Sequence, residues 1–209
     1  MKLHLIEDCL DAGAVLSLPH SPGRAIYVCA GQVRHDGTDH DTDAGFAASG
    51  PLELTAGPAG ACLWRFDLSE PGAGGTGHRV MPKLSGDVPE DLRGADAFIR
   101  LDAVAFPPGG TALLHTHRGP GIRCLREGTI RIDTQGHSTS YGPGSPWFET
   151  GPDPVFAQAD MQIQSRFIRA MVLPAELAGK SSIRYENPAD KDKPKSQSYR
   201  QFGEAPLRP

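Results

Sequence analysis

The sequence predicts an all-β fold of two barrels in tandem, and three observations support this prediction. The 209 residues include 25 glycines and 19 prolines, which is typical of many short strands joined by tight turns. Short apolar stretches bounded by Gly, Pro, Asp or Ser follow one another without sustained helical periodicity. The third observation is an internal repeat, which indicates that the two halves share one architecture.

The expected strands are rich in Ile, Val, Leu and Phe and are bounded by turn residues. They cover residues 25–29, 62–68, 97–106, 121–125, 129–133 and 166–173. A short helix is expected at "AELAG", residues 175–179. Such closely spaced short strands predict an antiparallel sandwich or barrel with few short helices.

The repeat pairs residues 13–37 with residues 110–136, and residues 48–68 with residues 142–158. Chance similarity between Gly/Pro-rich strands is the alternative, but two matches in the same order favour duplication. A glycine-rich, loop-like segment separates the halves, and a polar tail follows the second. The expected division is a first barrel at 1–75, a linker at 76–95, a second barrel at 96–178 and a C-terminal tail at 179–209. We expect the tail to be extended and to lie over a barrel or a neighbouring subunit.

Composition excludes several classes of partner and compartment. The formal net charge of −4 offers no basic surface for nucleic acid or an anionic membrane. No apolar run has the length of a membrane span or of a signal peptide's core. The four cysteines are far apart in the sequence, without a CxxC or zinc-finger spacing. We therefore expect a soluble, reduced, cytoplasmic protein whose partner is a small molecule.

Two histidines, His115 and His117, stand one residue apart in the apolar stretch "GGTALLHTHRGPG". Residues two apart on a strand project from the same face, so the two imidazoles are predicted to lie side by side. Imidazole is the commonest side-chain ligand of divalent transition metals. The alternative is an outward-facing pair wetted by solvent, and the His-x-His pattern alone does not separate the two.

The surroundings of the pair resemble the first signature motif of the cupin superfamily. Gly109 precedes His115 by five intervening residues, and Gly128 ends the motif. The Gly/Pro-rich stretch 142–154 resembles the second cupin motif. The resemblance implies two cupin-type double-stranded β-helix (jelly-roll) barrels in tandem. It also implies a divalent metal held by His115 and His117 in the second barrel.

The chain departs from the family pattern at two of the usual metal ligands. Gly121 stands where the first motif carries a Glu, and Pro154 stands near the place of the second motif's His. We expect Glu149, at the end of "SPWFE", to complete a site for Fe, Mn, Ni or Zn. Gln158 and His137 are weaker candidates for the third ligand, and His137 is expected to be exposed in a turn.

Two other groups of polar and charged residues are not expected to bind a metal. The first half keeps His20 but has Leu18 and Arg24 at the other ligand positions, so we expect no metal site there. In the second half, Arg100 and Asp102 share a face of one strand and are expected to neutralise each other.

Strand alternation places Arg123 in the barrel interior if position 121 faces inward. A buried guanidinium is costly unless it is paired, so Arg123 should meet either Glu149 or the carboxylate of a substrate. Trp147 and Phe148 are neighbours in the strand-like stretch "SPWFE", so their side chains point to opposite faces. One of them should therefore line the pocket.

These residues predict a metal-dependent enzyme that acts on a small, carboxylated metabolite. His115 and His117 would bind the metal, Glu149 would be a ligand or general base, and Arg123 would anchor the substrate. Dioxygenase chemistry and isomerase or lyase chemistry both remain open. The alternative is a non-catalytic ligand-binding or sensing protein, favoured by the two missing ligands. A homodimer is plausible because sheet edges need cover, and the sequence does not fix the oligomer.

Overall fold

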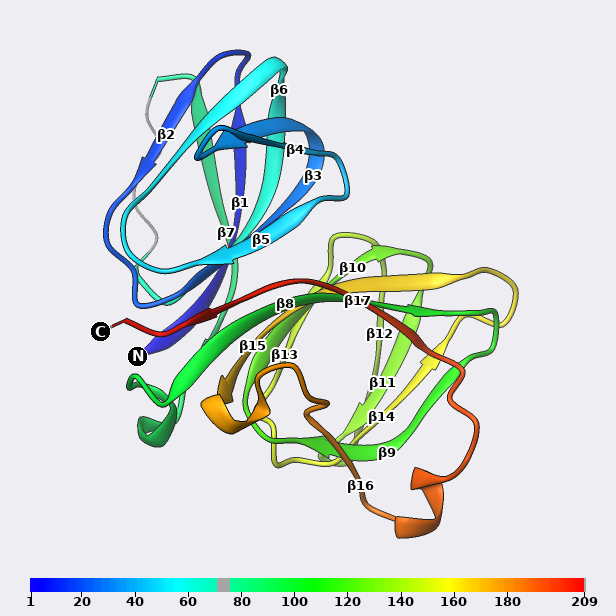
Figure 1. Cartoon of the computed structure of the whole chain (residues 1–209). Helices are drawn as coiled ribbons and strands as arrows, with labels where there is room; N and C mark the ends of the chain where they lie inside the picture. The colour runs from blue at the N-terminus through cyan, green and yellow to red at the C-terminus, as the bar shows by residue number, and fades with distance from the viewer. Residues whose placement is uncertain (71–75, 209) are drawn as a thin grey trace.

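The computed structural model describes residues 1–70 and 76–208, and almost every element is a β-strand (Figure 1). In the first half the strands are β1 (Lys2–Leu10), β2 (Val15–Leu18), β3 (Arg24–His35), β4 (Thr38–Asp41), β5 (Gly45–Ala48), β6 (Leu52–Asp67) and β7 (His78–Asp87). They form one antiparallel sheet in the order β4-β3-β6-β1-β7, with β2 beside β6 and β5 beside β3. The sheet curls around a core of aliphatic side chains that includes Leu16, Val28, Leu54 and Leu63.

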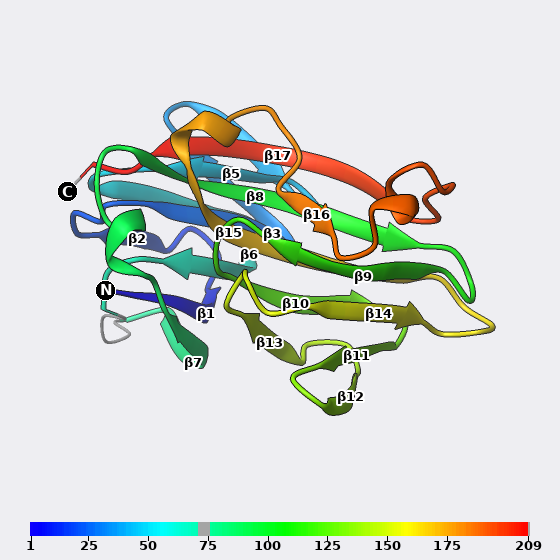
Figure 2. The same cartoon turned by 90° about the horizontal axis from the view of Figure 1, so that it is seen from below.

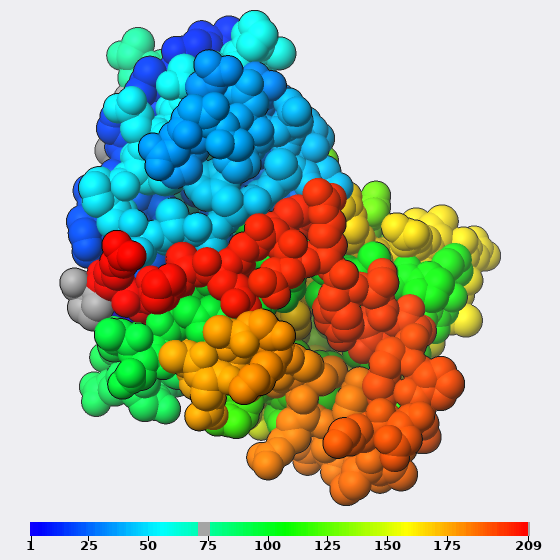
Figure 3. Space-filling model, viewed as in Figure 1, coloured from blue at the N-terminus to red at the C-terminus, as the bar shows by residue number. Residues whose placement is uncertain are grey.

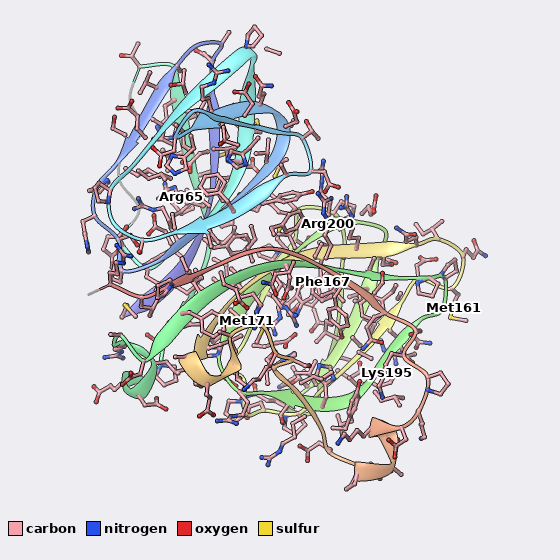
Figure 4. The ribbon with its side chains drawn as sticks, in the orientation of Figure 1. Arg65, Met161, Phe167, Met171, Lys195 and Arg200 are labelled. Atoms are coloured by element: carbon pink, nitrogen blue, oxygen red, sulfur yellow. The ribbon has the colours of Figure 1, made fainter. Side chains whose placement is uncertain are left out.

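The second half consists of two five-stranded antiparallel sheets that face each other across an apolar core. The first sheet contains β13 (Pro146–Glu149), β10 (Gly121–Glu127), β15 (Ser165–Pro174), β8 (Ala97–Phe106) and β17 (Ser198–Pro206), in that order. The second contains β12 (His137–Tyr141), β11 (Ile130–Thr134), β14 (Val155–Ala159), β9 (Thr111–His117) and β16 (Ile183–Tyr185). Each of the six expected strands, in both halves, coincides with an observed strand, except that residue 68 lies just after β6 and residue 129 just before β11. The interior is closed by Phe106, Trp147 and Phe167, and Figure 4 labels Phe167 in this half.

A third apolar cluster joins the two halves, which lie sheet against sheet (Figure 2). Tyr27 and Phe66 from the first half and Ile99, Ile122 and Ile168 from the second belong to it, and all five are completely buried. Each of these strands thus has one face in its own barrel and the other in the junction, because side chains alternate along a strand. The strands are accordingly apolar on both faces.

The segment expected to be a linker, residues 76–95, differs from that expectation. Residues 78–87 form β7, which pairs antiparallel with β1, and only the single turn η1 (Glu90–Leu92) and short connections join it to β8. Most side chains of β7 are exposed or half-buried, because it is an edge strand. An edge strand lacks the apolar alternation by which the other strands are recognised.

The C-terminal residues, expected as an extended tail over a barrel, are partly built into the sheets. Strand β16 pairs with β9, and β17 pairs along β8 from Ser198 to Pro206. Strand β17 also packs against β5 of the first half, and in Figure 3 it runs along the junction. The expected helix is the short 3₁₀ turn η2 (Ala175–Leu177), and a further turn, η3 (Pro188–Lys191), precedes β17.

No helix within residues 1–70 and 76–208 is long and apolar enough to cross a membrane.

Candidate metal and ligand site

The histidine pair lies in the interior of the second half, on β9. His115 and His117 are 6% and 7% exposed, and their ring centroids are 4.9 Å apart. Strand β9 runs between β14 and β16, with His115 opposite Val155 and His117 opposite Ile183. The alternative of a solvent-wetted outward pair is therefore wrong.

A contact at Nδ1 of each imidazole determines which ring nitrogen is free to bind a metal. Nδ1 of His115 lies 2.7 Å from the Leu113 carbonyl oxygen, and Nδ1 of His117 lies 3.2 Å from Ser182 Oγ. A carbonyl only accepts, so His115 carries its proton on Nδ1 and leaves Nε2 with a free lone pair. Burial lowers the pKa of both imidazoles, most strongly for His117, where Arg169 and Arg123 lower it further. Both rings are neutral at pH 7, the form that binds a metal.

Arg123 and Glu149 form a buried ion pair beside the histidines. Arg123 Nη2 lies 2.7 Å from Glu149 Oε2, but neither atom has a partner in hydrogen-bond geometry. Arg123 Nη1 donates to the Gly121 carbonyl oxygen, and Trp147 Nε1 donates to Glu149 Oε1 at 2.9 Å. Burial lowers the pKa of Arg123 to about 10, against the attraction of Glu149. Of the two partners expected for Arg123, the internal carboxylate is the one observed.

The same residues test whether a metal fits. His117 Nε2 and Glu149 Oε2 are 3.8 Å apart, whereas two ligand atoms of one zinc-like ion lie about 3–3.5 Å apart when each bond is about 2.1 Å. No group of three or more His, Cys, Asp or Glu side chains in the described ranges is placed to hold a metal ion. The Glu149 oxygen that lies nearest His117, Oε2, is also the one that contacts Arg123, at 2.7 Å. The histidine pair fits a metal through its free ring nitrogens, and the nearest carboxylate oxygen is Glu149 Oε2, which contacts Arg123 but has no partner in hydrogen-bond geometry.

A second buried ion pair, which the sequence did not indicate, lies on the neighbouring strands. Arg169 on β15 forms a bidentate contact with Asp102 on β8, with Nε and Nη2 each 2.8 Å from a carboxylate oxygen. Asp102 therefore does not neutralise Arg100, which instead donates to Glu204 on β17 at 2.6 Å and to the Lys180 and Leu177 carbonyl oxygens. The expectation differs because cross-strand register, not proximity in sequence, decides the partner: Arg169 lies directly opposite Asp102.

Three cavities border His117, and two of them also include other charged residues of the site. The inner one has a volume of about 30 Å³ and is bordered by both histidines, Arg123 and Glu149, which is room for one water or one ion. The outer one has a volume of about 330 Å³, within the range of small-molecule sites. Its walls include Arg100, Asp102, His117, Arg169, Lys180, Ser182 and Tyr199. His117 and Arg169 border both cavities.

The remaining sequence candidates lie away from this site or serve as its walls. Gln158 donates to Met161 Sδ in the loop before β15, and His137 is exposed at the start of β12. Trp147 borders the inner cavity, while Phe148 packs against the core at the junction of the two halves. The alternation predicted for this pair is confirmed.

The interior of the first half holds a different buried cluster. Arg65 donates to Asp8 at 2.6 Å and to Asp67 at 3.0 Å, and Arg24 donates to Asp67 at 3.2 Å. Figure 4 labels Arg65 among these strands. His78 Nε2 lies 2.9 Å from Asp8 Oδ1. Arginines and carboxylates thus neutralise one another in the interior of the first half.

Comparison with solved structures identifies the architecture. An oxalate decarboxylase from Lactobacillus farciminis, in a formate complex, matches 92% of this chain and 82% of its own, with a TM-score of 0.64 and 12% identity. The chain has the two-barrel cupin fold. An oxalate decarboxylase from Bacillus subtilis matches with a TM-score of 0.63 and 14% identity over 92% of this chain and 74% of its own. A cupin 2 conserved barrel domain protein from Leptotrichia buccalis matches with a TM-score of 0.51 and 8% identity, over 82% of this chain and 88% of its own.

No family model and no curated protein sequence matches the chain. The cupin fold expected from the His-x-His motif is therefore confirmed by structure, where sequence comparison finds nothing. At this level of identity the likeness carries the fold and leaves the reaction open.

Proposed function

We propose that this cupin is a metal-dependent enzyme that acts on a small carboxylated molecule in its second barrel. The observation that carries the proposal is the orientation of the histidine pair. Nδ1 of His115 is engaged by the Leu113 carbonyl oxygen and Nδ1 of His117 by Ser182 Oγ. A buried carboxylate oxygen without a partner in hydrogen-bond geometry lies 3.8 Å from His117 Nε2. Outward hydrogen bonds that set the tautomer are the usual support of metal-binding histidines.

His115 and His117 would hold the metal, which could be Fe, Mn, Ni or Zn. The Bacillus subtilis oxalate decarboxylase, which is similar in structure, has Mn(II) centres. A bound divalent ion would supply a Lewis acid, and a redox centre if it were iron or manganese. Glu149 would be the nearby carboxylate for proton transfer, with Arg123 fixing its position. Isomerase or lyase chemistry would need only the Lewis acid and the base, whereas dioxygenase chemistry would need the redox-active ion.

The outer cavity supports a carboxylated substrate. Arg169 uses Nε and Nη2 on Asp102, and within the described residues no hydrogen bond uses its third nitrogen, Nη1. The attraction of Asp102 outweighs burial and raises the pKa of Arg169, so the guanidinium stays charged. A carboxylate bound there would lie beside His117, because both residues border the same cavity. Arg123, enclosed and paired, would then position Glu149 and not the substrate.

Metal analysis tests the first part of the proposal. The untagged protein, reconstituted with each ion, should hold nearly one metal per chain, and His115→Ala/His117→Ala should hold none while keeping its circular dichroism spectrum. His137→Ala is the matched control, because His137 is exposed in a turn. Failure of the reconstituted wild type to take up metal would contradict the proposal.

Titration with oxalate as a probe tests the second part. Oxalate should bind the metal-loaded protein and should bind Arg169→Met at least ten times more weakly. Arg118→Met, an exposed arginine paired with Glu176, should bind like the wild type. Equal binding by both variants would remove Arg169 from the site.

A second candidate function is ligand binding without catalysis. The observation that favours it is the Arg123 contact, which neutralises Glu149 and leaves two potential metal ligands where cupins usually have more. In that case oxalate or another acid would bind the metal-free protein as tightly as the metal-loaded one.

A further inference from the structure

Two of the four cysteines lie directly opposite each other on adjacent antiparallel strands. In the β1–β6 ladder Cys9 is the register partner of Cys62, although the two are far apart in the sequence. Opposite residues on a ladder point to the same side of the sheet, so both thiols project from one face. Both cysteines are free and partly exposed.

The backbone hydrogen bonds show which kind of pair this is. Leu68 N donates to the Gly23 carbonyl oxygen, so the even-numbered residues of β6 direct their backbone groups toward β3. Cys62 is even-numbered and therefore turns its backbone groups away from β1. On the other side, Asp11 N donates to the Gly77 carbonyl oxygen, which directs the backbone of Cys9 toward β7. Cys9 and Cys62 are thus a non-hydrogen-bonded pair.

Non-hydrogen-bonded pairs bring their Cα atoms to about 4.5 Å. A disulfide needs about 4.4–6.8 Å between Cα atoms, so this is the type of cross-strand pair that can be bridged without moving the strands. The other two cysteines lack this relation. Cys29 is at the bulge of β3 between Val28 and Ala30, and Cys124 is buried on β10.

The surroundings assign different parts to the two thiols. Arg79 is the register partner of Cys9 on β7, and both border a surface cavity of about 340 Å³, which gives a small oxidant access. The Arg79 guanidinium contacts Cys9, and this contact raises the pKa of Arg79. Burial, with Cys9 as a second cause, raises the pKa of Cys62 to about 11. Cys9 is accordingly the nucleophile and Cys62 the resolving thiol.

We propose that Cys9 and Cys62 form a redox-active dithiol that closes to an intramolecular disulfide when the protein meets a hydroperoxide. The Cys9 thiolate attacks a peroxide oxygen, the O–O bond breaks, and the leaving hydroxide takes a proton to give water and a Cys9 sulfenic acid. Cys62 then attacks the Cys9 sulfur, the S–S bond forms, and the S–O bond breaks. The departing hydroxide takes the Cys62 proton, so two thiols and one hydrogen peroxide give one disulfide and two waters.

The test is peptide mapping of the full chain after treatment with one equivalent of hydrogen peroxide. Remaining thiols are alkylated before digestion. The expected product is a monomer with Cys9 and Cys62 in one linked peptide and with Cys29 and Cys124 alkylated. Cys29→Ser/Cys124→Ser should give the same linkage, which excludes a relay through the other thiols.

Two further variants test the roles of Cys62 and Arg79 separately. Cys62→Ser should accumulate a sulfenic acid at Cys9 that dimedone traps, and Arg79→Gln should form the disulfide several-fold more slowly than the wild type. A Cys29–Cys62 linkage, alkylation of all four cysteines, or an intermolecular dimer as the main product would each overturn the proposal. The metal content of the second barrel plays no part in this readout.

Discussion

Changing Glu149 to Gln removes one charge from the buried pair and keeps the side-chain volume. Arg123 is 1% exposed, and besides its ion pair with Glu149 it donates a hydrogen bond to the Gly121 carbonyl oxygen. A buried charge that loses its partner typically costs 3–5 kcal/mol, so Glu149→Gln should lower the free energy of unfolding by about 3–5 kcal/mol. The Trp147 hydrogen bond adds little, because the Gln carbonyl oxygen can still accept it.

Urea unfolding of the metal-free protein measures this loss. Trp147 fluorescence reports on the second barrel in a Trp64→Phe background, since the two tryptophans lie in different halves. The matched control is Asp133→Asn, whose ion pair with Arg131 is largely exposed and should be worth about 0–1 kcal/mol.

A double variant completes the cycle. Arg123→Met/Glu149→Gln removes both charges and should recover most of the loss, because the cost comes from one uncompensated charge. If Glu149→Gln unfolds at the same urea concentration as Asp133→Asn, the reasoning fails. Glu149 would then be free of Arg123 in solution and available as a metal ligand.

Three other outcomes are expected. Burial alone would raise the pKa of Asp67, but Arg24 and the hydrogen bonds around the carboxylate hold this pKa below 3.8. The ionised carboxylate therefore stabilises the fold above about pH 4, and this stabilisation is lost as the pH falls further. The difference in Tm between wild type and Asp67→Asn should accordingly shrink below pH 4. Gly31 has φ of +78° and would place a Cβ 2.1 Å from the Gly60 carbonyl oxygen, so Gly31→Ala should cost about 1–3 kcal/mol in urea unfolding. Ending the chain before Ser198 uncovers β8, and light scattering should detect association; a stable monomer would contradict this.

Much of the site could be predicted because strand alternation is a local property. The spacing of His115 and His117 requires one shared face, and counting inward from Gly121 places Arg123 in the interior. A buried arginine needs a carboxylate, and Glu149 at the end of a nearby strand was the available one. The glycines at 109 and 128 mark the ends of the motif on which the fold prediction rests. Each occupies a turn with positive φ, which other residues adopt only at a cost.

What the sequence could not supply is register between distant strands. The partner of Asp102 depends on which residue of β15 lies opposite it, and no local pattern specifies that Arg169 does. Ser182, which supports His117, directly precedes β16. That strand has three residues and no apolar alternation. Strand β7 is likewise unrecognisable because its side chains face solvent on an edge. These elements acquire their conformation from their neighbours, so periodicity does not reveal them.

The pairing of β17 with β8 has a consequence for synthesis of the chain on the ribosome. The sheet of the first half is complete once β7 is made, but β8 ends at Phe106 and its outer neighbour begins at Ser198, roughly 90 residues later. At typical elongation rates that interval is about 5–20 s, and throughout it the edge of β8 that β17 will cover stays unpaired, even after β15 has been made on the other side. A nascent chain should therefore expose this edge to chaperones or to other nascent chains long after the first half has folded.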